Sequence, residues 1–352
     1  MNGTGSGLRA GAAALAIGLL LLAAGLWAAG FDAAAALAAL WQGAFGSWYA
    51  FTSATLVRAV PLIVIGLGIA VAFRANALNI GAEGQFYAGA IAATWAGLHL
   101  GGSSPVLAIP AVWLVAAAAG ALWVALPAWL RLRFGVLEVI STLLLNFVAE
   151  SLVSWMVQGP LQEAKHIYPQ SDPIAAAARL PLLPGTRLHM GFLAGIALAV
   201  VVWYVFRRTV WGFELLATGA GPRAARVSGR IDVGRVTALA LLWSGAIAGL
   251  AGGLEVGGVS YALFQNLSPG YGFTAIAVAL LARLRPLAIV LTGIVFGALE
   301  AGAQAMQREA GIPAVAVYVV EGVIILVLLL AEATGRRART SVALPDAETD
   351  PA

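Results

Sequence analysis

Residues 105–130 read PVLAIPAVWLVAAAAGALWVALPAWL, an uninterrupted stretch without a single charged side chain. A helix needs about 20 mostly apolar residues to cross the hydrocarbon core of a membrane. Arg131 and Arg133 follow this stretch directly. An apolar run of this length that ends in basic residues is typical of a transmembrane helix with its last turn in the cytoplasm.

The composition of the whole chain agrees with this interpretation. Of its 352 residues, 61% are hydrophobic and only 10% are charged. Soluble domains are charged at about one residue in four, because a large folded chain needs a polar surface. The composition therefore excludes a water-soluble globule of this length.

Further apolar runs of similar length follow one another along the chain. We predict an all-α integral membrane protein, a polytopic bundle of about ten transmembrane helices. The runs at 81–100 and 271–284 are interrupted by glycine and polar residues and are the weakest of the set. The predicted spans are 10–29, 55–73, 81–100, 105–130, 138–158, 189–206, 236–258, 271–284, 286–304 and 311–332.

The arginines between these runs predict the topology, because cytoplasmic loops are enriched in Lys and Arg. With an even number of spans and both termini cytoplasmic, every basic cluster lies on the inner side. We expect an external loop at 159–188, a cytoplasmic loop at 207–235, a transmembrane domain over 1–335 and a disordered cytoplasmic tail over 336–352. The basic clusters are Arg9, Arg74, Arg131 with Arg133, Arg207 with Arg208, Arg223, Arg226, Arg230 and Arg235, Arg283 with Arg285, and Arg336, Arg337 and Arg339.

The segment before the second span has its own pattern. The first apolar run is longer than the core of a secretory signal and has only Arg9 before it, so we expect an uncleaved anchor. Residues 32–50 are rich in alanine and carry Trp41, Trp48 and Tyr49. Aromatic residues gather at headgroup depth, so we expect an interfacial helix on the outer face.

Several classes of function lack their required residues. The chain has no Cys, and His99, His166 and His189 are not spaced as ligands, so no metal site is expected. Lys165 is the only Lys and lies in no phosphate-binding loop. We therefore expect no bound cofactor and no enzyme activity, and the net charge of +4 reflects membrane topology rather than nucleic-acid binding.

Polar side chains and glycines concentrate between the second and third spans. Residues 72–85 read AFRANALNIGAEGQ and include Asn79, Glu83 and Gln85. Polar groups at membrane depth are tolerated where they line a cavity. The segment is either part of a transport pathway or a cytoplasmic turn that leads into a glycine-rich helix.

Carboxylates and an amide also lie within or near the apolar runs. Glu138, Asn146 and Glu150 belong to the fifth span, where Asn146 and Glu150 are one helical turn apart, and Glu255 and Glu300 lie in the seventh and ninth. A charge at the bilayer centre costs about 3 kcal/mol, so such residues usually face a bundle interior or a water path. Alternatively, those near span ends simply reach the interface.

Two segments predict packing contacts. Gly245, Gly249 and Gly253 repeat every four residues and form a small-residue ridge that lets another helix approach closely. In the loop at 207–235, Pro222 can begin a helix and Gly229 can end it. We expect a short helix there, outside the membrane, that can dock on a soluble partner or lie against anionic lipid.

Three stretches carry a resemblance to a known family: Phe73 to Gln85, Gly135 to Asn146 and Tyr271 to Pro286. They resemble permease subunits of ATP-binding-cassette (ABC) importers in the branched-chain amino acid and simple-sugar permease superfamily. Within that superfamily the chain is most similar to nucleoside and simple-sugar permeases that work with a BmpA-like binding lipoprotein. The resemblance extends from about the second span to the last.

The resemblance implies a mechanism and a set of partners. A cytoplasmic ATP-binding subunit would hydrolyse ATP, a second permease subunit would complete the path as a heterodimer, and an extracytoplasmic solute-binding lipoprotein would deliver the solute. The loop at 212–229 would contain the coupling helix that contacts the ATPase. The residues implied for this contact are Gly212, Phe213, Glu214, Ala217, Gly219, Ala224, Ala225 and Gly229.

The solute would be a nucleoside or a simple sugar, recognised by amide, carboxylate and aromatic groups. A branched-chain amino acid importer and an ion- or proton-coupled secondary transporter remain as alternatives, the latter using the intramembrane carboxylates. A membrane enzyme acting on a lipid-linked substrate lacks a catalytic cluster here. The residues expected to line the substrate pathway are Asn79, Glu83, Gln85, Glu138, Asn146, Glu150 and Phe264.

Overall fold

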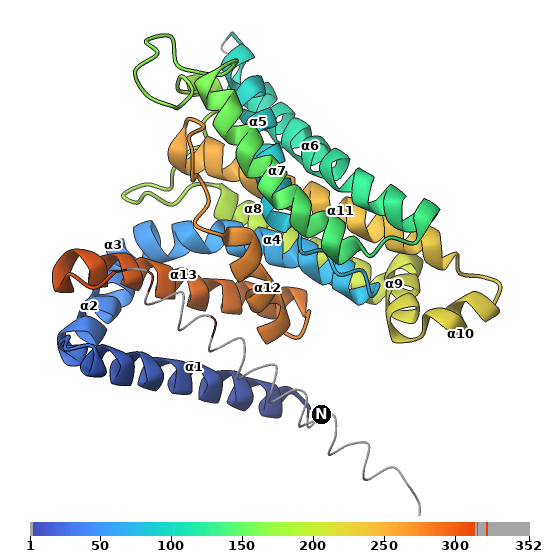
Figure 1. Cartoon of the computed structure of the whole chain (residues 1–352), viewed down its shortest axis with the longest axis horizontal. Helices are drawn as coiled ribbons and strands as arrows, with labels where there is room; N and C mark the ends of the chain where they lie inside the picture. Colours follow the sequence, from blue (N-terminus) through green and yellow to red (C-terminus); the bar gives the residue numbers. More distant parts are fainter. Residues whose placement is uncertain (1–2, 101, 314, 316–321, 323–352) are drawn as a thin grey trace, which may run out of the picture. The chain divides into compact units, whose positions relative to one another are not determined.

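A computed structural model of the chain describes residues 3–100, 102–313, 315 and 322, with side chains from Ala16 onward. The described residues are helical almost throughout and contain no β-strand, only two isolated bridges (Figure 1). The chain divides into two compact units. One combines residues 1–41 with 302–352, and the other comprises residues 42–301.

Most helices follow one another with short connections, but residues 159–190, between α7 and α8, contain only one short 3-10 turn. A π-helical turn adjoins each of two long helices, η1 before α4 and η3 after α11. The elements are α1 (Gly3–Ala28), α2 (Ala33–Phe45), α3 (Trp48–Ala50), η1 (Phe51–Thr55), α4 (Leu56–Arg74), α5 (Ala82–His99), α6 (Pro105–Phe134), α7 (Glu138–Gln158), the 3-10 turn η2 (Ala176–Ala178), α8 (Gly191–Arg208), α9 (Val210–Ala220), α10 (Pro222–Val227), α11 (Val233–Glu255), η3 (Val256–Ser260), α12 (Tyr271–Leu281) and α13 (Pro286–Ala310).

Within the described residues, six helices are long and apolar enough to cross a membrane. They are Trp48–Arg74, Pro105–Phe134, Glu138–Gln158, Gly191–Arg208, Val233–Ser260 and Pro286–Ala310. The other predicted spans are not among these six. α5 matches the run at 81–100 as a helix, but α12 has only 11 residues, about 16 Å, or half of a membrane core. Most of the run at 311–332 and all of the tail lie outside the described residues.

The expected single helix over 32–50 is wrong in its extent. α2 ends at Phe45, and Ser47 caps a new helix by accepting a hydrogen bond from the Ala50 N–H at 2.9 Å. Trp48 and Tyr49 therefore begin the helix that runs through η1 into α4. The Gly46–Ser47 pair provides the break that the alanine-rich composition hides.

In the unit of residues 42–301, α4 forms the centre. Its sequence is apolar on every side, and every residue from Ala59 to Ala72 is buried. A helix that is hydrophobic all round belongs inside a bundle rather than on its surface. α11, α12 and α8 pack around it.

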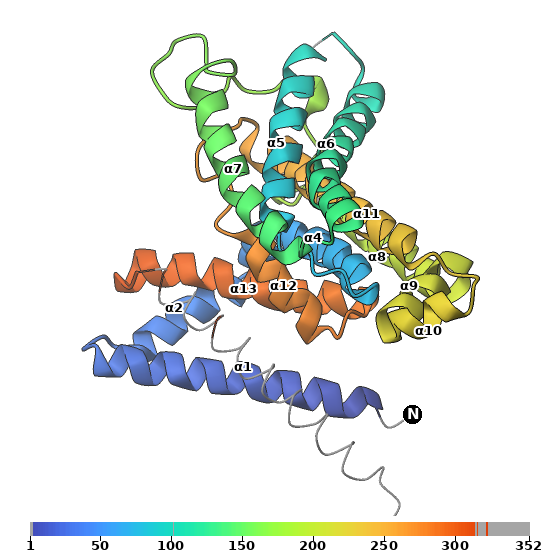
Figure 2. The same cartoon turned by 45° about the vertical axis from the view of Figure 1, so that its right-hand side comes forward.

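The glycine ridge of α11 packs against α6, as its spacing predicts. A Cβ on Gly249 would lie 2.8 Å from Cα of Gly120, and a Cβ on Gly253 would lie 2.8 Å from Cβ of Ala116. The backbones of the two helices therefore come close enough to exclude larger side chains. α5 and α6 pack against α11, and α7 packs against α5 and α6 on the side away from α11 (Figure 2).

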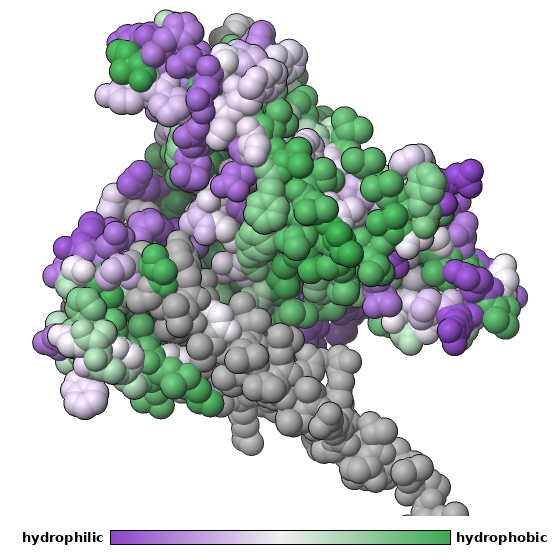
Figure 3. Space-filling model, in the orientation of Figure 1, coloured by the Kyte–Doolittle hydropathy of each residue, from purple (hydrophilic) through white to green (hydrophobic). Residues whose placement is uncertain are grey.

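Apolar and polar residues occupy different areas on the surface of this unit. Large hydrophobic side chains on α6 and α7 are exposed, and they form a continuous apolar area (Figure 3). Hydrophilic residues gather at the loop after α7 and around α10 (Figure 3). An exposed apolar area between polar ends is what a lipid-facing surface requires. The exposed residues include Leu114, Leu122 and Trp129 of α6 and Leu144, Phe147 and Trp155 of α7.

In the smaller unit, the end of α13 packs on the end of α2. A Cβ on Gly302 would lie 2.6 Å from the backbone oxygen of Leu40, so the two helices touch through backbone. Ala36, Ala39 and Leu40 of α2 are buried. Small residues thus allow close helix packing here as well.

Candidate functional site: a polar break between α4 and α5 and the start of α12

Residues 75–81 interrupt the helical path between α4 and α5, and Asn79 organises this break. Its amide donates to Oε1 of Gln85 at 2.8 Å and to Oγ of Ser244 at 2.9 Å. Its oxygen accepts from Nε2 of Gln85 at 2.8 Å and from the Gly81 N–H at 3.0 Å. All the hydrogen-bonding capacity of this fully buried amide is therefore used within the protein.

Asn146 joins α7 to the same break. Its Oδ1 accepts from the Gly84 N–H at 2.8 Å, and its Nδ2 donates to the backbone oxygen of Ile80 at 3.0 Å. These two backbone groups lie where α5 begins, at the end of a helix that leaves N–H groups without helical partners. Asn146 thus satisfies buried backbone groups of a helix other than its own.

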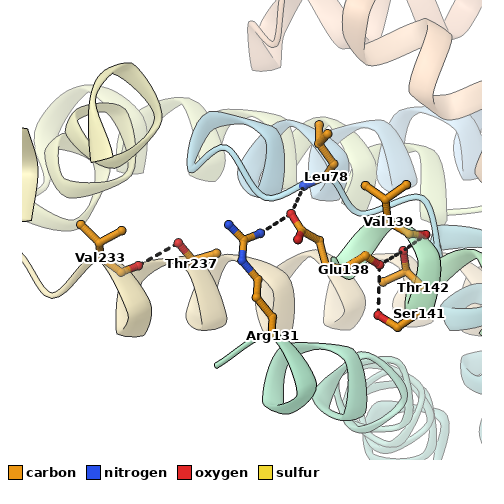
Figure 4. A network of polar contacts seen from close by, with 8 residues as sticks. All are labelled: Leu78, Arg131, Glu138, Val139, Ser141, Thr142, Val233 and Thr237. Carbon is orange, nitrogen blue, oxygen red and sulfur yellow. Dashed lines mark hydrogen bonds and ion pairs between the residues drawn. The ribbon is translucent and has the colours of Figure 1, made fainter. Parts of the chain in front are cut away.

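Glu138 connects the start of α7 to the break between α4 and α5 (Figure 4). Its carboxylate accepts from the Leu78 N–H at 3.1 Å and forms an ion pair with Arg131 at the end of α6. Thr142 adds a hydrogen bond from its hydroxyl to the Glu138 backbone oxygen at 2.7 Å. Glu138 therefore connects α6, α7 and the 75–81 segment at one point.

Glu83 connects α5 to the start of α12. Its carboxylate accepts from the Gly272 N–H at 2.6 Å and from the Ser268 side chain. The Ser268 hydroxyl in turn accepts from the N–H groups of Gly270 and Tyr271 at 3.1 and 2.9 Å. A carboxylate and a hydroxyl at the N-terminus of a helix stabilise its free N–H groups and complement its dipole. Gly272 packs so tightly against the Glu83 backbone that a Cβ would overlap it.

Glu150 and Phe264 differ from the residues above because both are exposed. Glu150 lies one turn beyond Asn146 on α7, and its charge acts on Glu83. The segment that contains Phe264 reaches α7 through a hydrogen bond of 3.2 Å from Gln265 to Ser154. The structure therefore joins the 264–272 segment to Glu83 and to α7, the helix that carries Glu150, with Asn79, Gln85 and Glu138 at the neighbouring break.

The loop at 207–235, which the sequence predicts to be cytoplasmic, contains two helices, α9 and α10. The short helix expected from Pro222 is present as α10, and Gly229 after it has φ of +69°. α9 precedes it and begins at a cap in which Thr209 Oγ1 accepts from the Gly212 N–H at 3.1 Å. The sequence alone did not predict α9 as a separate helix.

The eight residues implied for ATPase coupling differ in how far their side chains are exposed. A Cβ on Gly219 would overlap the backbone oxygen of Arg74, so this glycine packs α9 against the end of α4. Phe213, by contrast, is 65% exposed. Gly212 and Ala225 are buried, Gly219, Glu214 and Ala217 are partly buried, and Phe213, Ala224 and Gly229 are exposed.

Sequence reasoning missed Ser244, Ser268 and Gly272. Ser268 stands before Pro269 and Gly270 at the start of an apolar run, which is a helix-start signal that could have been recognised. Ser244 and Gly272 gave no local signal, because their roles depend on partners 165 and 189 residues away.

His189 is a further buried polar residue, just before α8. Its Nδ1 accepts from the Gly191 N–H at 3.2 Å, and its ring packs against Gly258. Burial lowers the pKa of His189 to about 4, so the ring stays neutral at physiological pH. Within the described residues, no group of three His, Cys, Asp or Glu side chains is placed to hold a metal ion.

Comparisons with known proteins agree with this architecture. The family model described as "Branched-chain amino acid transport system / permease component" matches residues 51–329. The glucose ABC transporter permease protein TsgB13 of Haloferax volcanii is 38% identical over 79% of this chain and 75% of that protein. The guanosine ABC transporter permease protein NupP of Bacillus subtilis is 35% identical over 89% of this chain and 90% of that protein. No solved structure matches the chain.

Six membrane-length helices and a family match over most of the chain lead to the same conclusion. Relatives of this similarity are permease subunits, which are not enzymes themselves, and a permease of an ABC importer works with an ATPase and a solute-binding protein. The chain is a multi-pass membrane protein and an ABC transporter permease subunit, and it belongs to the branched-chain amino acid transport system permease family.

Proposed function

We propose that this permease imports a nucleoside or a simple sugar. The observation that carries the proposal is the similarity to relatives named for guanosine and glucose transport, which extends over most of both chains. The buried polar network supports it, because a bundle keeps amides and carboxylates at membrane depth where they build or border a solute path. ATP energy would enter through contact with a separate ATP-binding subunit.

The path itself would run along α7, α5 and the 264–272 segment. An exposed carboxylate in the middle of a membrane helix is costly in lipid, so Glu150 would face water or a partner subunit. Phe264 would supply an aromatic surface beside it. Glu83 would border the path, and Asn79, Gln85, Glu138 and Asn146 would hold its wall in place through the bonds described above.

The topology would comprise ten spans with both termini in the cytoplasm. This arrangement places all the arginine clusters inside, as the positive-inside rule requires. Residues 1–335 would form the transmembrane domain, with the loop at 159–188 outside, the loop at 207–235 inside and a disordered tail over 336–352.

The α9–α10 pair would form the contact with the ATPase. Phe213, Leu216 and Val227 expose large apolar side chains there, with 65%, 53% and 88% of their surface accessible. Exposed apolar residues on a predicted cytoplasmic loop favour a protein partner. Gly212, Gly219 and Ala225 would set the angle of the two helices, and Glu214, Ala217, Ala224 and Gly229 would complete the surface.

The assembly would be a heterodimer of this chain and a related permease, with a solute-binding lipoprotein on the outer face. The exposed apolar surface of α6 and α7 is available for lipid or for the second permease. Two rival functions remain distinct: a secondary carrier driven by a proton or ion gradient, and a branched-chain amino acid importer.

Uptake by cells that contain the whole transporter tests the function. Radiolabelled guanosine, D-glucose and leucine are offered separately, first to energised cells and then after the proton gradient is collapsed while ATP is maintained. We expect uptake of guanosine or glucose that persists without the gradient. Uptake that stops with the gradient would support the secondary carrier instead, and uptake of leucine alone would support the amino acid importer.

A further inference from the structure

Arg74, the last residue of α4, contacts three other parts of the bundle. Its guanidinium donates to the backbone oxygen of Leu284, in the turn between α12 and α13, from Nε at 3.3 Å and from Nη2 at 3.1 Å. The Arg74 Cζ atom also lies 4.3 Å from the centroid of the Phe206 ring near the end of α8, within the range of a cation–π contact. A Cβ on Gly219 of α9 would overlap the Arg74 backbone oxygen. Arg74 therefore joins α4 to α8, to α9 and to the α12–α13 turn by direct contact.

α9 packs on both members of the Arg74–Phe206 pair. A Cβ on Gly212, in the first turn of α9, would lie 2.8 Å from Cα of Phe206. Gly219, about two turns later, meets the Arg74 carbonyl. At both points the backbones approach so closely that a larger side chain would not fit. The position of α9 and the position of this pair therefore depend on each other.

The turn that Arg74 contacts has an unfavourable backbone conformation. Arg283 and Leu284 have φ of +52° and +54°, both in the left-handed region. Residues larger than glycine rarely adopt this conformation, and two in succession cost free energy. The turn ends α12, since the Leu284 N–H donates to the Ala279 oxygen at 2.9 Å. The two charge-assisted hydrogen bonds from Arg74 to the Leu284 oxygen offset part of that cost.

α12 lies between this turn and the candidate path. It has only 11 residues and packs along α4. At its start, the Gly272 N–H donates to the Glu83 carboxylate at 2.6 Å. At its end, the following turn places the Leu284 oxygen on Arg74. A short helix that is hydrogen-bonded at both ends is a rigid connection between them.

We propose that Arg74 is a positioning residue for transport, which holds the turn after α12 against α9 so that α12 relays the state of the α9 contact to Glu83. The inference rests on the importer function proposed above and adds the residue and the helix through which the coupling surface reaches the path. Coupling between distant sites requires a packed element that has two arrangements. The left-handed turn is that element, because release of the Arg74 hydrogen bonds removes the interaction that offsets its strain.

The amount of solute imported per ATP hydrolysed tests the proposal in the complete transporter. Proteoliposomes contain the whole assembly, with ATP inside and the solute-binding protein outside, and are offered guanosine or D-glucose. We expect Arg74→Leu to import about tenfold less solute per ATP hydrolysed than the wild type, because two charge-assisted hydrogen bonds are lost. Arg74→Lys should give an intermediate ratio, since an ammonium retains the charge but not the planar donor geometry. A loss of stability would reduce the number of assembled transporters and leave this ratio unchanged.

A second substitution tests the role of the turn. Leu284→Gly retains the backbone oxygen and removes the steric cost of the left-handed conformation. In the Arg74→Leu background it should raise the import ratio by about threefold, because the turn then depends less on Arg74. A structural role predicts a further loss instead, since glycine removes a partly buried side chain.

The matched control is Arg133→Leu, the same chemical change at an exposed arginine in the last turn of α6. It should retain the import ratio of the wild type. An unchanged ratio in Arg74→Leu would overturn the proposal, and so would a ratio that Leu284→Gly lowers further. If the wild type imports neither guanosine nor D-glucose, the proposed function itself fails before any variant is compared, and this inference fails with it.

Discussion

At the scale of single residues, buried amides hold the backbone of this bundle in place. Asn79 and Asn146 direct their amides to partners inside the protein and thereby fix the backbone between α4 and α5. These buried amides therefore maintain the fold.

The reciprocal amide pair of Asn79 and Gln85 gives a prediction about stability. Asn79→Leu leaves the Gln85 amide buried without its partner, and we expect a loss of about 2–4 kcal/mol. Gln85→Leu should cost a similar amount. The double variant should lose less than the sum, because no unpaired amide of the pair then remains. Thermal unfolding of the purified complex in detergent measures all three, and strictly additive losses would contradict the role of the pair.

At the scale of elements, close backbone contacts determine how the helices of the 207–235 loop pack on the membrane helices. α9 touches the end of α4, the helix at the centre of the bundle, where Gly219 meets the Arg74 carbonyl. α12 begins in mid-structure because Glu83 and Ser268 cap its first N–H groups. Both features rest on contacts between segments far apart in the sequence.

The Gly219 contact predicts a difference between two neighbouring glycines. Gly219→Ala places a methyl group into the Arg74 carbonyl and should cost about 1–3 kcal/mol, with a lower melting temperature of the complex. Gly221→Ala serves as the control, because the nearest atom to its new methyl group is 3.7 Å away and its φ of −166° is extended. Equal melting temperatures of the two variants would show that α9 does not depend on this contact.

The sequence predicted the membrane helices more reliably than the site. Lipid imposes a length and a composition on a spanning helix, so long apolar runs predicted the six long helices of the described residues to within several residues at their ends. The exception is the first of them, which begins at Trp48. The break at 75–81 was recognised from its polar residues, and the helix at Pro222 from its proline. The partners of those residues could not be predicted, since Ser244 and Gly272 meet Asn79 and Glu83 only through the tertiary fold.

At the scale of the whole molecule, the chain combines membrane-length helices with a loop at 207–235 that is predicted to be cytoplasmic. It carries no phosphate-binding loop of its own, so a permease of this kind depends on a partner for ATP hydrolysis. The exposed apolar residues of α9 and α10 are the surface that we propose for contact with that partner. Energy would pass from the partner through α9 to α4 by direct packing.

Purification of the tagged permease from its native membrane in mild detergent tests this dependence most directly. We predict that an ATP-binding subunit co-purifies with the wild type and is lost from Phe213→Glu, which charges the exposed surface of α9. Ile167→Glu is the matched control, because Ile167 is also 65% exposed but lies in the loop predicted to be external. It should retain the ATP-binding subunit. Recovery of the wild-type permease without any ATP-binding subunit, in several detergents, would contradict the account.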